Sequence, residues 1–353
     1  MTRNILIGVG GSGQHVVHAY LRLLALTSPK PGEIPHVFLI DADAKEGAHE
    51  VKRSTLVEDA IKLHAFLVAG HPNPSRFGLV RPFHVDEEQG GPGILGQLLG
   101  VAGSTNSEMA VAHAFLADDP GDFGSDWEVE VAQGMMANPK VGAVALGHKI
   151  AMEVRHHPAS GAKAAIERLI NAPLDNARIA IIGSSFGGTG SGVVPELVRQ
   201  LDVLPGARSI RAYFTLPWFT LDTGSGSRHS AAKERDGVDP KLRNAALGLH
   251  ACHGEVSGAE DAKYRLRQSS YVLAQSMRTW GATVRPSSGD SDQPEHPHVL
   301  NIVLASAVQT FFGVGPGNLN AGRLYVLKTA NAGESRGQFS PDIAPSEFSC
   351  WRR

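Results

Sequence analysis

Cysteine is nearly absent from this sequence: its 353 residues include only two, Cys252 and Cys350. Two cysteines without metal-ligand spacing cannot form a zinc site or the disulfide framework of a small secreted scaffold, so we expect a reducing, cytoplasmic location. Net charge is also lacking, because 33 Lys and Arg oppose 35 Asp and Glu. A formal charge of −2 gives no general attraction to nucleic acid or to an anionic membrane, and we expect no nucleic acid as a partner.

Long apolar runs are missing as well. The longest apolar region, 299–314, is interrupted by Asn301, Ser306 and Gln309 and falls short of the ~20 residues that cross a bilayer. The apolar segment at 5–9 is too short for the core of a signal peptide and leads straight into a glycine turn. We therefore expect a buried helix at 299–312 and no insertion into a membrane.

What the sequence does contain is a globular composition, with 42% hydrophobic and 19% charged residues. Strand-like and helix-like segments alternate, which predicts an α/β fold: a parallel sheet with helices on both faces. We expect strands at Asn4–Val9, His36–Ile40, Ile179–Ile182, Ser209–Leu216 and Ser269–Ala274. We expect helices at Gln14–Leu26, Thr55–Val68, Val141–Val154, Ala162–Ile170, Leu242–His253 and Val299–Phe312.

Loop-forming clusters rich in Gly, Pro, Ser and Asp fill the segment from about 71 to 130. We expect an insertion there, carrying helices at Ile94–Val101 and Glu108–Leu116. The expected organisation is one domain over 1–312, ending in the apolar helix, and a short C-terminal segment over 313–353.

The most informative segment is 183–192, which reads GSSFGGTGSG between an apolar strand and a helix. Backbone N–H groups are unpaired where such a loop enters a helix, and the helix dipole favours an anion there. Glycines let the main chain approach a ligand closely. The hydroxyls can bond phosphate oxygens or a metal-bound water, and they belong to Ser184, Ser185, Thr189 and Ser191.

A second glycine-rich turn, GVGGSGQHVV at 8–17, also follows a strand and precedes a helix. Two phosphate-binding turns in one chain predict a nucleotide that is held from two sides. Two other segments accompany them: LIDADAKEG at 39–47 places acidic residues after a strand, and QGMMANPKVG at 133–142 has Asn138 and Pro139 suited to starting a helix.

In their order along the chain, GVGGSGQHVV, DADAKEG, GMMANPKVG, GGTGSG and LPWF resemble the nucleotide loops of the tubulin/FtsZ superfamily, most nearly its bacterial tubulin-like proteins. The likeness spans about residues 4–220. It implies a GTP/GDP-binding, Mg²⁺-dependent domain that self-associates into an oligomer or filament, with GTP hydrolysis completed at a subunit interface.

The resemblance also implies roles for individual residues. Gly10, Gly11, Ser12, Gly13 and Gln14 would hold the α- and β-phosphates, and Asp41 and Asp43 would lie near Mg²⁺ or the ribose. Ala137 and Asn138 would lie near the γ-phosphate, and Pro217 would open the loop towards the ribose. The β- and γ-phosphates would lie against Gly187, Gly188, Thr189, Gly190 and Ser191. His298 and Asn301, at the start of the helix that looks like the family's central helix, are candidate base contacts.

The sequence departs from the family pattern at two places, and the first departure predicts slow turnover. Family members that hydrolyse GTP carry acidic residues just after the central helix, whereas Gly313–Arg323 here has Asn318 and Asn320 and no carboxylate. About forty residues follow that helix, so we expect the family's second domain to be reduced or absent. A catalytic residue is therefore not assigned.

Two other functions remain open. A nucleotide-binding switch or scaffold that does not hydrolyse its ligand fits the missing acid. The first glycine turn, with Asp41 about thirty residues later, also fits a dinucleotide-binding or adenylating enzyme. His296 and His298 have no second His or Cys pair at ligand spacing, so we predict no metal site built from protein side chains.

Overall fold

Parallel strands form the centre of the protein. The computed structural model describes residues 3–40, 50–80, 95–99, 139–185, 187–204, 209–216, 269–275, 299–313 and 324–328, with 245, 248–249, 252 and 255 between them. These residues include a seven-stranded, wholly parallel sheet in the order β3-β2-β1-β4-β5-β6-β7. The strands are β1 (Arg3–Val9), β2 (His36–Ile40), β3 (Phe77–Val80), β4 (Ala177–Ser184), β5 (Ser209–Thr215), β6 (Ser269–Gln275) and β7 (Leu324–Lys328).

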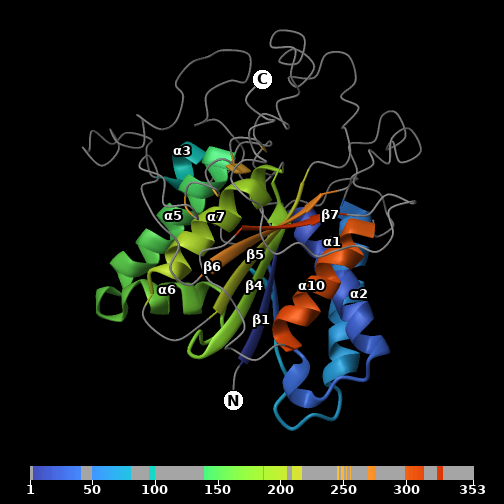
Figure 1. Cartoon of the computed structure of the whole chain (residues 1–353). Helices are drawn as coiled ribbons and strands as arrows, with labels where there is room; N and C mark the ends of the chain where they lie inside the picture. The colour runs from blue at the N-terminus through green and yellow to red at the C-terminus, as the bar shows by residue number, and fades with distance from the viewer. Residues whose placement is uncertain are drawn as a thin grey trace, which may run out of the picture.

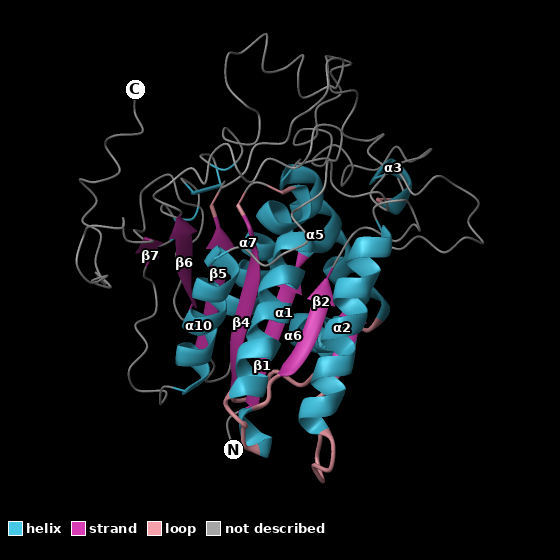
Figure 2. Cartoon of the chain, turned by 90° about the vertical axis from the view of Figure 1, so that its right-hand side faces the viewer, coloured by secondary structure: helices cyan, strands magenta, loops and turns pink. Residues whose placement is uncertain are grey.

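Helices cover both faces of this sheet (Figures 1 and 2). One face carries α1 (Gly10–Leu26), α2 (Glu50–Val68) and α10 (Val299–Gly313), and the other carries α5 (Pro139–His156), α6 (Gly161–Leu169) and α7 (Gly188–Asp202). Shorter pieces are α3 (Leu95–Leu98) and the 3₁₀ turns η1 (Pro31–Glu33) and η5 (Pro158–Ser160). The predicted α/β class, with a parallel sheet and helices on both faces, is confirmed.

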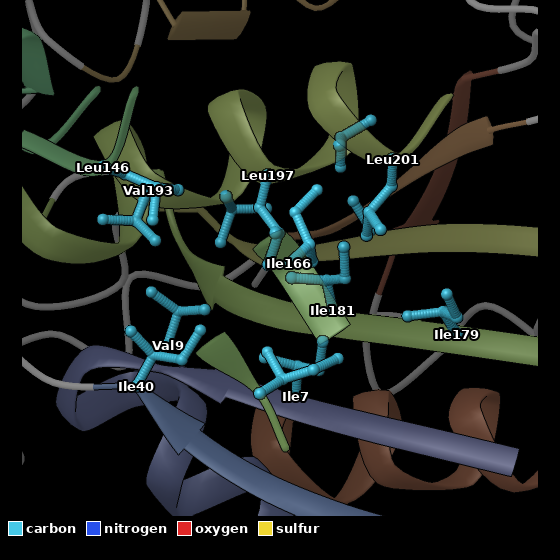
Figure 3. Packing of buried hydrophobic residues seen from close by; sticks show 14 of the residues in the cluster. Ile7, Val9, Ile40, Leu146, Ile166, Ile179, Ile181, Val193, Leu197 and Leu201 are labelled. Carbon is cyan, nitrogen blue, oxygen red and sulfur yellow. The ribbon is translucent and has the colours of Figure 1, made fainter. Parts of the chain in front are cut away.

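The central strands are apolar at nearly every position because both of their faces are covered. In β4, Ile179 and Ile181 pack towards α5, α6 and α7, while Ala180 and Ile182 pack towards α1 and α10. Figure 3 shows the first of these two cores, where Ile181 lies near Leu197 of α7. Two apolar layers thus hold the sheet edge, at which α1 and α7 begin, in a fixed position.

The helix α10 runs antiparallel to the strands. At its end, the guanidinium of Arg178, near the start of β4, donates to the carbonyl oxygens of Phe311 and Phe312. The start of α10 therefore lies at the opposite edge, where the strands end. Leu304 and Val308 are fully buried on the sheet side of this helix. The predicted buried helix at 299–312 is confirmed, and within the described residues no helix is long and apolar enough to cross a membrane.

Several helices begin earlier than the sequence indicates. We predict helices from Gln14 and from the residues after 192, yet α1 begins at Gly10 and α7 begins at Gly188. The expectation of a glycine-rich loop at 183–192 and a glycine-rich turn at 8–17 is wrong over these positions, because most of the glycines lie in the first helical turns. Small residues here allow a helix to begin immediately at the end of its strand.

Two strands were not predicted. The edge strand β3 lies inside the segment expected to be an insertion, and it pairs with β2. The strand β7 lies in the expected C-terminal segment and pairs with β6. The expected helix at Glu108–Leu116 and the residues after β7 lie outside the described residues. Of the expected helix at Leu242–His253, only 245, 248–249 and 252 are described, and all of these are helical. The division into 1–312 and 313–353 stays a prediction.

Candidate functional site

The order of the strands points to one place on the sheet. The chain proceeds from β1 outward through β2 to β3, and then returns to the other side of β1 with β4. In open α/β sheets, ligands bind outside the carboxyl ends of the strands where the order reverses in this way. The strands β1 and β4 are direct neighbours, with Gly8 paired to Ile182. Both glycine-rich segments follow these two strands, so the fold brings them to this point.

The glycine-rich segment at 8–17 allows α1 to begin directly against β4. Gly10 has φ of 65°, a left-handed backbone conformation that favours glycine. A Cβ on Gly13 would lie 2.6 Å from the carbonyl oxygen of Ile182 and 2.9 Å from the carbonyl carbon of Gly8. Any larger side chain at position 13 would push the first turn of α1 away from the sheet. Gly13 is thus required for packing, whether or not it also approaches a ligand.

The glycine-rich segment at 183–192 likewise allows α7 to begin directly against the end of β4. A Cβ on Gly190 would lie 2.7 Å from the nitrogen and 2.9 Å from the oxygen of Ser184, at the end of β4. The first turn of α7 therefore lies directly on the last residue of the strand. The N-terminal capping position of α7 is Gly187, and that of α1 is Val9, and neither helix has a side-chain cap. The first backbone N–H groups of both helices thus lack the capping partner that a side chain commonly supplies.

The two helix starts lie side by side. A Cβ on Gly10 would lie 3.4 Å from the Cβ of Thr189 and 3.6 Å from the nitrogen of Gly190. The positive ends of two helix dipoles, each with uncapped N–H donors, therefore meet at one place. Such a place favours an anion more strongly than either helix start alone.

A third helix start reaches the same place. A Cβ on Gly192 would clash with the carbonyl oxygen of Pro139, the first residue of α5. A Cβ on Gly142 would lie 3.0 Å from the carbonyl oxygen of Gly188. The first turns of α5 and α7 are therefore in direct contact through glycines. The first turns of α1, α5 and α7 carry no acidic residue that would offset their positive ends.

The hydroxyls of the second segment have different partners. Ser184 Oγ accepts a hydrogen bond from the Gly187 N–H at 3.1 Å, and Ser191 Oγ donates to the Gly187 carbonyl oxygen. Ser185 Oγ donates to the carbonyl oxygen of Thr215 at 3.2 Å. We expected these hydroxyls to face phosphate, but two of them donate their proton to the main chain and the third accepts from it.

Thr189 differs from the serines, because its hydroxyl makes no hydrogen bond with any residue that the structure describes. It lies in the first turn of α7 with 9% of its surface exposed. A hydroxyl in this position can donate to an anion that lies against the helix start. Thr189 is therefore the side chain of this segment best placed to contact a ligand.

The structure brings part of the predicted site together. Gly10–Gln14 and Gly187–Ser191 meet at the switch point, as the resemblance implies. Asn301 lies in the first turn of α10, is buried, and faces the same side as Leu304. Because α10 begins at the carboxyl edge of the sheet, Asn301 lies at the same edge as the glycine segments, on the face that carries α1. The other predicted residues lie outside the described part of the chain: Asp41, Asp43, Ala137, Asn138, Pro217 and His298.

The sequence analysis did not predict two contacts that build the site. The contact between α5 and α7 depends on Gly142 and Gly192, which lie 50 positions apart. Both glycines occur within the quoted motifs, but their mutual contact follows only from the tertiary packing. The Thr215 carbonyl, which holds Ser185, also carries no sequence signal because it is a main-chain group.

Two groups with shifted pKa values, His36 and Glu255, lie away from this place. Burial, with Arg3 and Arg76 nearby, lowers the pKa of His36 to about 4 at the start of β2, the amino edge of the sheet. Burial raises the pKa of the Glu255 carboxyl, which accepts a hydrogen bond from Tyr271. Within the described residues, no such group lies in 8–14 or 183–192, and no cluster of His, Cys, Asp and Glu could hold a metal ion. The described part of the site is equipped to bind an anion.

Comparison with known proteins gives likenesses to solved structures. No protein-family model and no curated protein matches the chain. Among solved structures, the chain is similar to a GTPγS-bound protofilament of CetZ2 from Haloferax volcanii, with a TM-score of 0.40 and 13% identity, over 90% of this chain and 60% of that one. It is also similar to CetZ from Methanosaeta thermophila strain DSM 6194, with a TM-score of 0.36 and 14% identity, over 89% of this chain and 54% of that one.

The chain thus spans little more than half the length of these two structures.

Proposed function

We propose that this protein binds a guanine nucleotide, GTP or GDP with Mg²⁺, at the switch point between β1 and β4. The observation that carries the proposal is the contact between Gly10 and Thr189, which joins two uncapped, glycine-rich helix starts. One helix start suits a single phosphate group. Two adjacent starts, with a third in contact, suit the chain of phosphates in a nucleoside triphosphate.

The sequence resemblance supplies the residue roles, and the arrangement of the helix starts supports those at the phosphates. Gly10–Gln14 would bind the α- and β-phosphates, and Gly187–Ser191 the β- and γ-phosphates. Asn301 and His298 would face the base, and Pro217 the ribose. Asp41 and Asp43 would lie towards Mg²⁺ or the ribose, while Ala137 and Asn138, just before α5, would lie near the γ-phosphate.

Self-association with slow turnover is the second part of the proposal. It rests on the family resemblance, in which residues after the central helix complete the site of the next subunit. Asn318 and Asn320 stand there in this chain and offer no carboxylate to orient a water molecule. A bound ligand that is hydrolysed slowly or not at all suits an assembly factor, a switch or a scaffold.

A dinucleotide-binding enzyme is the alternative that a specific observation favours. Gly8, Gly10 and Gly13 follow the G-x-G-x-x-G spacing, and Gly13 packs closely against β4, as that fingerprint requires. The strand order 3-2-1-4-5-6 is common to that fold as well. What favours a nucleoside triphosphate is the second glycine-rich helix start at Gly188.

Chromatography of the nucleotide released from the purified protein separates these possibilities. GTP or GDP would support the proposal. Recovery of NAD, or of ATP, would instead support a dinucleotide-dependent or an adenylating enzyme, and the proposal would fail.

A further inference from the structure

We propose that Ser184 is the positioning residue of the phosphate-binding turn, and that the serines of this segment hold the turn while Thr189 and the main chain contact the phosphates. The inference rests on the proposed function, which supplies the ligand. It adds a division of roles among four hydroxyls that look equivalent in the sequence GSSFGGTGSG.

Both main-chain polar groups of Gly187, its N–H and its carbonyl, are hydrogen-bonded to serines. Its N–H donates to Ser184 Oγ at 3.1 Å, and its carbonyl oxygen accepts from the Ser191 N–H at 2.9 Å and from the Ser191 hydroxyl. The N–H and C=O of one peptide point in opposite directions. Because the Gly187 carbonyl points along α7 towards Ser191, the Gly188 N–H in the same peptide points away from the helix. Ser191 thus sets the direction of the Gly188 N–H, the first donor of α7, and Ser184 holds the preceding peptide through the Gly187 N–H.

Ser184 is the least replaceable of the three serines. Its Oγ is the hydrogen-bond acceptor for the Gly187 N–H, and the first turn of α7 lies on its main chain at Gly190. Ser185 is different, because the Thr215 carbonyl oxygen accepts both its hydroxyl and its N–H, the latter at 3.0 Å. Removing the Ser185 hydroxyl therefore leaves the Thr215 carbonyl bonded. Ser191 is similar, because its helical N–H still bonds Gly187 when its hydroxyl is removed.

The hydroxyls of Ser185 and Ser191 have already donated their protons to main-chain oxygens. Their lone pairs can still accept a hydrogen bond or face a cation, but they cannot also donate to a phosphate oxygen. The Thr189 hydroxyl retains its proton for that purpose and lies in the first turn of α7, whereas the Ser184 oxygen is already engaged as the acceptor of the Gly187 N–H. This assignment makes Thr189 a ligand contact and Ser184 a residue that acts through the main chain.

The test compares Ser184→Ala with Ser185→Ala as the matched control and Thr189→Ala as the ligand-contact variant. Binding of GTP, GDP and guanosine is measured for each by competition with a fluorescent GTP analogue. We expect Ser184→Ala to weaken GTP and GDP by roughly five- to twentyfold, the range of one lost hydrogen bond. Guanosine, which has no phosphate, should change less than about twofold. Ser185→Ala should change none of the three by more than that.

A variant that keeps an acceptor atom at this position guards against a folding defect. Ser184→Cys places a weak acceptor at the same position, so it should recover part of the GTP affinity lost in Ser184→Ala. Wild-type GTP affinity in Ser184→Ala, or an equal loss for guanosine and GTP, would overturn the inference. If Thr189→Ala alone weakens GTP, the proposed function stands and only the role of Ser184 fails. If the wild-type protein binds none of the three ligands, the proposed function itself fails.

Discussion

Gly10 and Thr189, which are 179 positions apart, meet at the carboxyl edge of the sheet: a Cβ on Gly10 would lie 3.4 Å from the Cβ of Thr189. The contact joins the first turn of α1 to the first turn of α7. Neither turn has a side-chain cap, and neither carries an acidic residue. The two helix dipoles therefore add at one place, where an anion would satisfy donors that the protein leaves uncapped.

Thr189→Ala should weaken nucleotide binding with little effect on stability, because the Thr189 hydroxyl has no hydrogen-bond partner among the described residues. Losing a hydrogen bond to a charged oxygen costs about 1.5–3 kcal/mol, or roughly ten- to a hundredfold in affinity. Thr189→Ser keeps the hydroxyl and serves as the control. Isothermal titration with GTP measures both, and equal affinities for wild type and Thr189→Ala would remove this side chain from the site.

Gly13→Ala should destabilise the fold. The added Cβ would lie 2.6 Å from the carbonyl oxygen of Ile182, and neither backbone segment can move without disturbing the sheet. Overpacking of this kind typically costs about 1–3 kcal/mol. Gly32→Ala is the control, because a Cβ on Gly32 meets nothing within 4 Å. Thermal unfolding followed by circular dichroism measures both; a Gly13→Ala melting temperature as high as that of Gly32→Ala would contradict the packing described for α1.

Stability should fall as the pH drops from 6.5 towards 4. One cause in the folded state is His36, whose pKa is lowered to about 4 by burial and by the cations Arg3 and Arg76. Above the ordinary value of 6.5 the ring is neutral in both states. Below it the unfolded chain takes up a proton that the folded chain resists, so the contribution of His36 is lost as the pH falls.

His36→Asn tests this pH dependence. The Nδ1 atom of His36 accepts a hydrogen bond from the Arg76 N–H at 3.1 Å, and an Asn oxygen can accept in its place without titrating. Urea unfolding at several pH values should show a shallower loss of stability for the variant between pH 6.5 and 4. An identical slope for both proteins would mean that His36 is protonated in the folded state.

Asn301→Ala should weaken GTP binding by about three- to tenfold, because a neutral hydrogen bond contributes about 1 kcal/mol. The side chain is buried in the first turn of α10, and no described residue hydrogen-bonds it. It therefore has amide groups available for a base. Competition with GTP and inorganic tripolyphosphate separates the outcomes. An equal loss for both ligands would mean that Asn301 does not face the base.

Turnover, if it occurs, should be slow and should rise with protein concentration. In the proposed assembly the site is completed by a neighbouring subunit, and 313–323 lacks a carboxylate. General-base help typically contributes roughly 10²–10⁴-fold to a rate. Phosphate release is measured across a range of protein concentrations. A fast rate per subunit that does not depend on concentration would show a self-contained catalytic site.

The sequence predicted most of the sheet because its central strands are continuous apolar runs. The bounds of β2 were predicted correctly, and those of β1 and β5 within one residue. The strand β3 was missed because its four residues include Gly78 and lie between loop-forming clusters. What makes Phe77–Val80 a strand is its pairing with β2, a tertiary contact that local pattern cannot reveal.

The sequence predicted which residues form the site better than it predicted their conformation. The glycines at 10–13 and 187–190 were identified, and the fold brings them together. They were expected to form loops because glycine is a poor helix former. Here packing overrides that preference, since Gly13 and Gly190 lie where a Cβ would strike the adjacent strand. The separate roles of the serines could not be predicted, because they depend on main-chain acceptors such as the Thr215 carbonyl.

The most direct test of the account is equilibrium competition among GTP, ATP and NAD for the wild-type protein in the presence of Mg²⁺, with a fluorescent GTP analogue as the probe. We predict that GTP displaces the probe at least tenfold better than ATP or NAD, a difference of about 1.4 kcal/mol. A tenfold preference for ATP or NAD, or no binding of the probe at all, would contradict a guanine nucleotide site at the starts of α1 and α7.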